Sequence, residues 1–294
     1  YRYKGFIRGR EPVNGIIEHL PDCGGLQELA RVIETHKIRL VVIAMERSEK
    51  AEVEEIIDLL SEKDVQISIV PDTLDILSGS VKADSLFGPV LTGIKTGLMP
   101  EWQQNIKRVI DVVISLPLLV LMSPVLVYAA IRTRISSPGR IVYSQERVGY
   151  KGKTFNILKF RSMYADAEIN GPQLSSKNDP RVTSWGKVMR KWRIDELPQL
   201  LNVLKGEMSL VGPRPERSYY VQQLSKKSPY FRYLLKVKPG LTSWGMVQFG
   251  YAGTLDEMIE RMKFDLIYIE NISLALDLKI MLYTIKIILK GQGR

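Results

Sequence analysis

The amino-acid sequence predicts an α/β protein with two domains, the second mainly helical and associated with a membrane. Three observations lead to this prediction. Strand and helix patterns alternate over residues 1–90, residues 112–131 form an apolar run without a charge, and amphipathic helical patterns recur in the rest of the chain. At 294 residues the chain is long enough for two domains, which we separate by a linker at residues 91–105. The second domain then covers residues 106–294.

The N-terminal residues have the pattern of a small parallel sheet covered by helices. Apolar strand patterns at residues 5–9, 38–45 and 65–71 alternate with helical patterns at residues 26–37 and 51–63. Continuous apolar strands between helices indicate a parallel, Rossmann-like sheet. No G-x-G-x-x-G follows any of these strands, so we interpret the domain as regulatory or assembling and not as a cofactor site. Because the chain begins abruptly and without Met, we expect the domain to be truncated.

The uncharged run at residues 112–131 has the length of a bilayer-spanning helix. Ser123 and Pro124 interrupt it, and a proline inside a helix kinks or breaks it. Both flanks are basic, and basic flanks prefer the cytoplasmic side of a membrane. We therefore predict a re-entrant helix at about residues 107–134, broken at Ser123–Pro124, that enters and leaves through one membrane face. The alternative is a buried core helix, which usually carries a polar stripe that this run lacks.

Two adjacent carboxylates begin the next helical pattern. Asp195 and Glu196 stand in RIDELP, and the leucines that follow recur at helical spacing as far as Gly206, a typical C-terminal glycine. One interpretation is helix capping, because acidic side chains complement the free N–H groups of a first turn. The other interpretation is that the two carboxylates take part in chemistry, and the basic residues near them help to decide between the two.

A rigid arginine follows this helix. Pro213 and Pro215 flank Arg214 in SLVGPRPE and restrict the backbone on both sides. A guanidinium matches a phosphate bidentately, and fixing it in advance lowers the ordering cost of binding. An ordinary proline-stiffened turn is the alternative.

Further basic residues stand near the two carboxylates or on the preceding strand. Arg190 and Arg193 lie just upstream of the acidic pair, and Lys159 and Arg161 share one face of a predicted strand. Together with the rigid arginine they favour a phosphate site over a solvated surface.

The charge balance agrees with an anionic ligand. The 42 Lys and Arg against 32 Asp and Glu give a formal net charge of +10, which suits phosphorylated small molecules, acidic lipid headgroups or nucleic acid. Cys23 is the single cysteine, and the histidines are His19 and His36. The sequence therefore excludes an intrachain disulfide, a Cys/His zinc cluster and a histidine-based triad.

Several ordered motifs resemble one family. They are SP at 123–124, QERVG at 145–149, KFRSM at 159–163, DPR at 179–181, RIDELPQLLNVLKGEMSLVGPRPE at 193–216, KPGLTSW at 238–244 and YIENISLALDLKI at 268–280. In this order they resemble the bacterial sugar transferases, which are monotopic polyprenyl-phosphate phosphoglycosyl transferases. The resemblance covers about residues 100–294. The preceding residues resemble the Rossmann-like domain of long-form members, such as undecaprenyl-phosphate galactose and glucose phosphotransferases.

The resemblance implies a reaction and roles for the quoted residues. A sugar 1-phosphate passes from a UDP-sugar to undecaprenyl phosphate, UMP leaves, and the product enters O-antigen, capsule or exopolysaccharide synthesis. Asp195 matches the nucleophile that forms a covalent phosphosugar intermediate, and Glu196 matches the glutamate that supports it with Mg²⁺. Arg190 and Arg214 match phosphate-binding arginines, and Asp265 matches a further acid.

The resemblance also implies partners and a location. It places the protein at the bacterial inner membrane, in contact with its lipids, with the active site facing the cytoplasm, and implies a homodimer and no nucleic acid. Two alternatives are weighed against it. A nucleotide-sugar epimerase or dehydratase requires a G-x-G-x-x-G and a Tyr-x-x-x-Lys, and the chain has neither. A membrane-tethered scaffold that binds nucleotide sugars requires only that the acidic pair caps a helix.

Overall fold

The computed structural model divides the chain into two compact units, Tyr1–Gly97 and Leu98–Arg294. Each unit is described by itself. The residues whose structure is described are 3–9, 20–45, 50–61, 63, 65–70, 92–94, 99–169, 171–175 and 179–291. The division falls inside the expected linker at residues 91–105, part of which lies outside the described residues.

The first unit is built from short strands and helices, as its periodicity predicts. Its elements are β1 (Phe6–Arg8), β2 (Asp22–Gly25), η1 (Leu26–Glu28), α1 (Leu29–His36), β3 (Leu40–Ile43), α2 (Lys50–Ser61), β4 (Gln66–Ile69) and β5 (Thr92–Ile94). The three expected strands and two expected helices are confirmed. The buried side chains of Ile33, Ile56, Leu60 and Ile67 form part of its core.

The sheet topology of this unit differs from the single parallel sheet that we predicted. β3 pairs parallel with β4, but β5 pairs antiparallel with β4, and β1 pairs with β2 in a separate sheet. An antiparallel edge strand on an otherwise parallel sheet is common, because such a strand needs no crossover helix. The unit is therefore α/β with mixed pairing, and the Rossmann-like topology stays a prediction.

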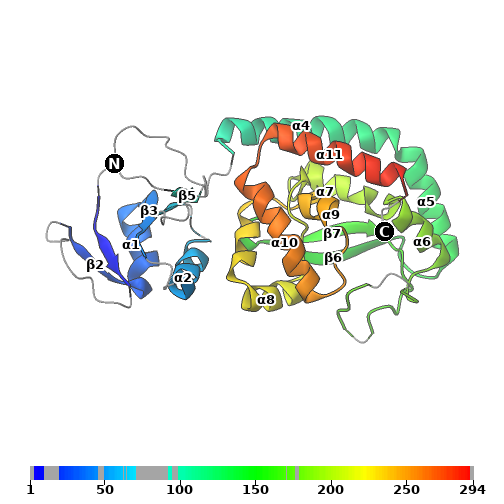
Figure 1. Ribbon diagram of the computed structural model, residues 1–294. Helices are drawn as coiled ribbons and strands as arrows, with labels where there is room; N and C mark the ends of the chain where they lie inside the picture. The colour runs from blue at the N-terminus through cyan, green and yellow to red at the C-terminus, as the bar shows by residue number, and fades with distance from the viewer. Residues whose placement is uncertain are drawn as a thin grey trace. The chain divides into compact units, whose positions relative to one another are not determined.

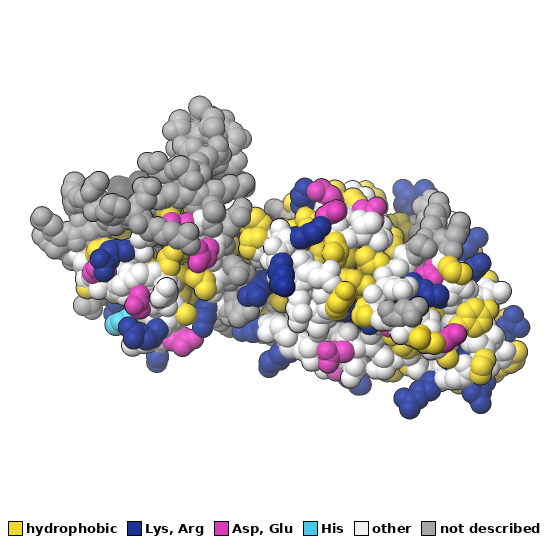
Figure 2. Space-filling model, turned by 90° about the horizontal axis from the view of Figure 1, so that it is seen from below, with side chains coloured by type: hydrophobic (Ala, Val, Ile, Leu, Met, Phe, Trp, Pro, Cys, Tyr) yellow, Lys and Arg dark blue, Asp and Glu magenta, His cyan; other side chains and the backbone are white. Residues whose placement is uncertain are grey.

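The second unit is mainly helical, as predicted. Its helices are α4 (Glu101–Leu121), α5 (Ser123–Ser136), α6 (Ser184–Lys191), α7 (Leu200–Lys205), α8 (Ser218–Lys227), α9 (Trp244–Gln248), α10 (Leu255–Glu270) and α11 (Leu274–Leu289), with the 3₁₀ segments η3 (Tyr150–Gly152), η4 (Ile194–Gln199) and η5 (Pro229–Lys236). Its strands are β6 (Val142–Val148), β7 (Thr154–Phe160), β8 (Ser209–Val211) and β9 (Gly240–Thr242). β6 and β7 form an antiparallel hairpin, and β8 pairs parallel with β9. Lys and Arg side chains are spread around this unit on the face drawn in Figure 2.

The helix break occurs where the sequence predicts it. α4 ends at Leu121, α5 begins at Ser123, and the two helices are bent by 61° at the intervening Met122. Pro117 stays inside α4, so only the second proline coincides with a break. None of the described helices is by itself long and apolar enough to span a bilayer, whereas the bent pair meets both criteria when taken together.

The inner side of α4 carries a polar stripe just before the uncharged run. Arg108 donates to the carbonyl oxygens of Val203 and Leu204 at the end of α7. Asp111 accepts from the backbone N–H of Leu210 at 3.0 Å. Lys107 pairs with Asp277 of α11, which lies beside α4 (Figure 1). These bonds hold α4 against α7, β8 and α11.

The helix at RIDELP differs from the prediction in its type. Residues Ile194–Gln199 form the 3₁₀ segment η4, and only the leucines from Leu200 onward form an α-helix, α7, which ends at Gly206 with a φ of +85° as predicted. Pro198 lies inside η4, has no N–H to donate and restricts the residue before it, which favours a short tight turn over a continuous α-helix. Arg193 holds the N-cap position, and no side-chain cap is present at this end. Asp195 is therefore not the N-cap residue, whereas the prediction that both acids lie in the first turn of a helical segment is confirmed.

Candidate active site

Glu196 lies where three basic side chains converge. Its Oε1 atom lies 3.5 Å from Lys159 Nζ and 3.5 Å from Arg214 Nη1. Its Oε2 atom lies 3.5 Å from Arg193 Nη1. Burial raises the pKa of Glu196, but the charges of the three basic groups outweigh it and hold the pKa of this carboxyl below its ordinary value. Glu196 is therefore an ionised carboxylate that joins β7, η4 and the loop after β8.

Arg193 reaches Glu196 from an uncommon backbone conformation. Its φ of 52° and ψ of 25° lie in the left-handed region, which costs a residue other than glycine on the order of 1–3 kcal/mol. Such strain persists where the surroundings hold it in place, and here the contact with Glu196 is one such restraint.

Asp195 is the buried member of the acidic pair. Its side chain is 7 % exposed, and within the described part of the chain no hydrogen bond or ion pair reaches its carboxylate. Burial and the neighbouring charge of Glu196 raise its pKa above the ordinary aspartate value, while Lys159 and Arg190 act in the opposite direction. A buried carboxylate without a partner is costly. Its oxygens are thus available to a ligand that compensates this cost.

Lys159 shares the buried environment of the acidic pair. Burial lowers the pKa of its ammonium group to about 8, and the charge of Glu196 opposes that shift. Its position follows from the hairpin, because Lys159 is the next-to-last residue of β7 and pairs with Tyr143 of β6. Strand pairing therefore fixes the backbone from which this cation extends.

Arg190 is positioned by two serines. It lies in the last turn of α6, where its Nε atom donates to Ser162 Oγ at 3.0 Å and its Nη1 atom donates to Ser175 Oγ at 2.9 Å. Its charge lowers the pKa of Asp195, which places its guanidinium within electrostatic reach of that carboxylate. The sequence predicted Arg190 for this site but did not predict its contacts with the two serines, although Ser162 stands in the KFRSM motif.

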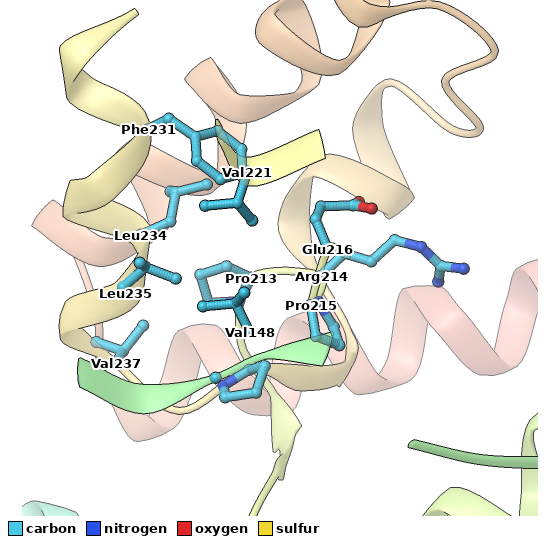
Figure 3. A pocket seen from close by; sticks show the side chains of 12 residues that line it. Val148, Pro213, Arg214, Pro215, Glu216, Val221, Phe231, Leu234, Leu235 and Val237 are labelled. Atoms are coloured by element: carbon cyan, nitrogen blue, oxygen red, sulfur yellow. The ribbon is translucent and has the colours of Figure 1, made fainter. Parts of the chain in front are cut away.

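Arg214 projects from the loop after β8 away from an apolar cavity that its flanking prolines help to line. Figure 3 shows Pro213 and Pro215 beside Val148 and Val221, with the guanidinium of Arg214 on the other side. Its Nη1 atom lies 3.3 Å from the sulfur of Met246. The prolines therefore anchor the loop by packing, and the arginine extends to Glu196.

Close contacts between strands also hold this loop. A Cβ atom added to Gly212 would lie 2.3 Å from the carbonyl oxygen of Lys238, so only glycine fits there. The N–H of Gly212 donates to Thr242, and the N–H of Gly240 donates to the carbonyl of Pro213. The backbone around Arg214 is thus bonded on both sides.

Glu216 is a residue of this region that sequence reasoning missed. Its Oε1 atom accepts from Arg261 Nη2 at 2.6 Å, and its Oε2 atom accepts from Arg147 Nη1 at 3.3 Å. The three side chains are buried and come from the GPRPE loop, α10 and β6. They tie the loop to two distant elements. The acid after Pro-Arg-Pro was visible in the sequence, but its partners are far away along the chain.

Asp265 lies in α10 and holds the start of α9. It is 2 % exposed and accepts from the N–H of Gly245 at 2.8 Å. Burial raises its pKa to about 6, although this hydrogen bond and the charge of Arg261 act against the shift. Because Met246 follows Gly245 and touches Arg214, Asp265 supports the site from behind and is not among the groups that contact the acidic pair.

Arg161 is directed to the end of α5 and not to the acidic pair. Its guanidinium donates to the carbonyl oxygens of Thr133, Ser137 and Arg140. The last carbonyls of a helix have no intrahelical donor, so a buried guanidinium there satisfies several of them at once. Of the four predicted phosphate-binding cations, the structure brings Lys159 and Arg214 to Glu196, and Arg190 within electrostatic reach of Asp195.

Asp195 and Glu196 are also the residues expected to hold Mg²⁺. Among the described residues, no group of three or more His, Cys, Asp or Glu side chains could hold a metal ion. Mg²⁺ is usually held by one or two carboxylates together with substrate phosphates and water. Asp195 and Glu196 supply two adjacent carboxylates, and that of Asp195 has no hydrogen bond or ion pair in the part of the chain that the structure describes. This donor set fits an ion shared with a bound diphosphate.

Comparison with known proteins decides the family. Residues 102–291 match the family model of the bacterial sugar transferases. The chain belongs to the bacterial sugar transferase family. The resemblance drawn from the sequence motifs is thus confirmed. The matched range of this sugar transferase includes α4 except its first residue, all of α5, and the acidic and basic side chains of the candidate site.

Curated relatives of this sugar transferase carry names that describe a reaction. It is 42 % identical over 217 residues to the UDP-N-acetylgalactosamine-undecaprenyl-phosphate N-acetylgalactosaminephosphotransferase of Aeromonas hydrophila, which covers 74 % of the chain and 51 % of the relative. It is 35 % identical over 268 residues to the UDP-glucose:undecaprenyl-phosphate glucose-1-phosphate transferase of Escherichia coli (strain K12), which covers 90 % and 57 %. The chain thus spans about half the length of these relatives.

Proposed function

We propose that this sugar transferase moves a sugar 1-phosphate from a UDP-sugar to undecaprenyl phosphate and releases UMP. The names of the relatives describe this class of reaction in those proteins. One structural observation carries the proposal. Asp195 is a buried carboxylate with no hydrogen bond or ion pair among the described residues, and it lies next to Glu196, on which three cations converge. Such a site combines a nucleophile with charges that neutralise phosphates.

The reaction proceeds in two displacements. A carboxylate oxygen of Asp195 attacks the phosphorus atom that carries the sugar, and the bond from this phosphorus to the oxygen of UMP breaks, with the electron pair leaving on UMP. An oxygen of undecaprenyl phosphate then attacks the same phosphorus, and Asp195 leaves as a carboxylate. Dividing the reaction in this way lets one phosphate site serve two bulky substrates in turn.

The basic residues neutralise the phosphate oxygens during both steps. Arg214 is held by its loop and Arg190 by two serines, so little ordering is required when phosphate binds. Lys159 adds a compact charge beside Glu196. Asp195 and Glu196 would hold Mg²⁺ together with the diphosphate, and the ion, when bound, neutralises charge on the transferred group.

We further propose a location and a role in the cell. The bent pair of α4 and α5 supports a re-entrant membrane helix, because two apolar helices joined at a break can enter and leave through one face. On this proposal the chain lies at the bacterial inner membrane with its active site facing the cytoplasm. There it supplies lipid-linked sugar for O-antigen, capsule or exopolysaccharide synthesis. The Rossmann-like first domain and the homodimer stay predictions.

The test combines turnover with detection of the covalent step. Purified protein is incubated with a panel of UDP-sugars, Mg²⁺ and undecaprenyl phosphate, and UMP is measured. Without acceptor, we expect one UMP per active site and a phosphosugar adduct on the peptide that contains Asp195. Asp195→Asn should give neither. Normal turnover by that variant would reject the covalent mechanism, and nucleotide-sugar binding without any UMP would favour the scaffold alternative.

A further inference from the structure

A cavity of about 330 Å³ lies between α4, α11 and β8. Its walls are aliphatic side chains from all three elements: Ile110 and Ile114 of α4, Val211 of β8, and Leu278 and Met281 of α11. A space of this kind is suited to a hydrocarbon ligand. It is separate from the small cavity behind Pro213 and Pro215.

The charged residues at the edge of this cavity bind one another. Lys107 Nζ lies 2.5 Å from Asp277 Oδ2 and also donates to the carbonyl of Val211 at 3.0 Å. The hydroxyl of Tyr268 donates to Asp277 Oδ1 at 2.7 Å. Asp111 accepts from the backbone of β8. Because these groups are already paired, the remaining lining is apolar, and a charged ligand would find no partner there.

The helices that form the cavity also carry apolar side chains on the surface. Leu278, which lines the cavity, is 54 % exposed, and the neighbouring turns of α11 expose Leu282 and Ile285. α4 exposes Val113 and Leu116 and is one half of the bent pair with membrane-like composition. The cavity is therefore continuous with a surface suited to hydrocarbon, and a long apolar chain could enter it from that side.

One wall of the cavity leads directly to the phosphate-binding loop. Val211 is the last residue of β8, and Arg214 follows three residues later. Three residues span at most about 10 Å, so the Cα atoms of Val211 and Arg214 lie within that distance of each other. A lipid whose phosphate contacts Arg214 would therefore have its first apolar segment within reach of this cavity.

We propose that this cavity binds the first isoprene units of the lipid-phosphate acceptor. The inference rests on the proposed function and adds to it a site for the acceptor chain. The isoprenoid is favoured over a phospholipid acyl chain because it joins a phosphate directly to a hydrocarbon chain. Arg214 of the loop can bind the phosphate, and the neighbouring cavity can bind the hydrocarbon chain.

The test compares acceptor chain lengths in a pair of matched variants. Leu278→Trp fills the cavity, whereas Leu282→Trp makes the same change one turn further along α11, at a side chain that is 59 % exposed and does not line it. Binding of dimethylallyl phosphate and of geranylgeranyl phosphate is measured with the full chain in detergent. The wild-type protein should bind the longer chain at least about tenfold more tightly, because it buries more methylene groups. Leu278→Trp should lose this preference, and Leu282→Trp should keep it.

Three results of the chain-length comparison would overturn the proposal. They are a wild-type protein without a chain-length preference, a preference that survives in Leu278→Trp, and an equal loss in both variants. Excess phosphatidylglycerol should leave the preference for the longer isoprenoid intact. If phosphatidylglycerol abolishes this preference, the cavity binds phospholipid and the proposal is wrong. UMP release without acceptor is measured in parallel and should be unchanged in Leu282→Trp, whose side chain does not line the cavity. Because binding does not depend on turnover, a protein that releases no UMP but retains the preference would refute only the proposed function.

Discussion

Arg214 Nη1 lies 3.5 Å from Glu196 Oε1, and this contact joins the Pro-Arg-Pro loop to the acidic pair. The arginine and the glutamate are both largely buried, and each is held by other parts of the second unit. The loop and the acidic pair therefore form one rigid arrangement. We expect substitutions on either side of the contact to affect the reaction more than the stability of the fold.

Arg214→Lys keeps the positive charge but removes the planar fork that matches a phosphate. We expect kcat/KM for the UDP-sugar to fall about 10- to 100-fold, because a charge-assisted hydrogen bond contributes about 1.5–3 kcal/mol. The melting temperature should change little. Arg217→Lys, in the same segment but paired with Glu168, is the control. Equal losses in both variants would argue against a specific role for Arg214.

The pH dependence of kcat/KM should show two limbs. In the proposed mechanism Asp195 reacts only when it is ionised. Because its pKa is raised, activity should fall as the pH drops through a value above that of an ordinary aspartate. The pKa of Lys159 is lowered to about 8, so its charge and its contribution are lost as the pH rises through that region. In Lys159→Arg the alkaline limb should move to higher pH, since a guanidinium keeps its charge. An alkaline limb that does not move would assign it to another group.

Glu196→Gln separates the two carboxylates. The charge of Glu196 raises the pKa of Asp195, so its removal should move the acidic limb of the pH profile to lower pH. At neutral pH we expect kcat to fall, because the variant loses the carboxylate on which three cations converge. The adduct on Asp195 should still form, more slowly, and mass spectrometry of the acceptor-free reaction measures it. An acidic limb that moves to higher pH would contradict this account.

Asp265 links stability to pH. Its folded-state pKa is raised to about 6, so its contribution to the free energy of unfolding is fully present below the unfolded-state pKa and is lost as the pH rises through 6. Asp265→Asn removes this dependence. Between pH 4 and pH 8 the stability of the variant should increase relative to the wild type by about 2 kcal/mol, which is most of the total that a pKa shift of about two units supplies. Thermal melting at several pH values measures the difference, and a constant difference would refute it.

Arg161→Gln should weaken the junction between β7 and α5. The variant leaves up to three carbonyl oxygens without their buried donor, and we expect the free energy of unfolding to fall by about 2–4 kcal/mol. Arg134→Gln changes an exposed side chain at the same helix end that makes one hydrogen bond, and it should cost less than about 1 kcal/mol. Denaturant unfolding compares them. Equal stability of the two variants would show that the buried bonds contribute little.

Sequence periodicity predicted those elements whose conformation depends on residues close together in the chain. The strand at residues 38–45, the amphipathic helix at 51–63 and the break at Ser123–Pro124 follow from side-chain alternation, helical spacing and a missing backbone donor. The segment at RIDELP shows where this approach stops. Its leucines continue the helical pattern, but Pro198 and the contacts of Glu196 favour a 3₁₀ segment at its start.

Contacts between distant residues were not predictable in the same way. The sequence predicts Arg161 on a strand face with Lys159, but β7 ends at Phe160 and the partners of Arg161 are carbonyls in and just after α5, more than 20 residues away. Glu216 binds an arginine 45 residues later in the chain, and Asp265 binds a backbone N–H 20 residues earlier. Charge and spacing alone do not specify which distant backbone a side chain meets. The family motifs pointed to Asp265 as a further acid, but they did not indicate that it holds the start of α9.

The polar stripe on α4 has a mechanical consequence. Lys107, Arg108 and Asp111 bind three different elements of the protein, while the opposite side of the same helix is apolar. Such a helix cannot roll about its axis or slide along it without breaking several bonds together. In the proposed membrane location, the depth of α4 in the bilayer would therefore also set the height of Asp195 relative to the lipid phosphates, because α4 is bonded to α7 and η4 leads directly into α7.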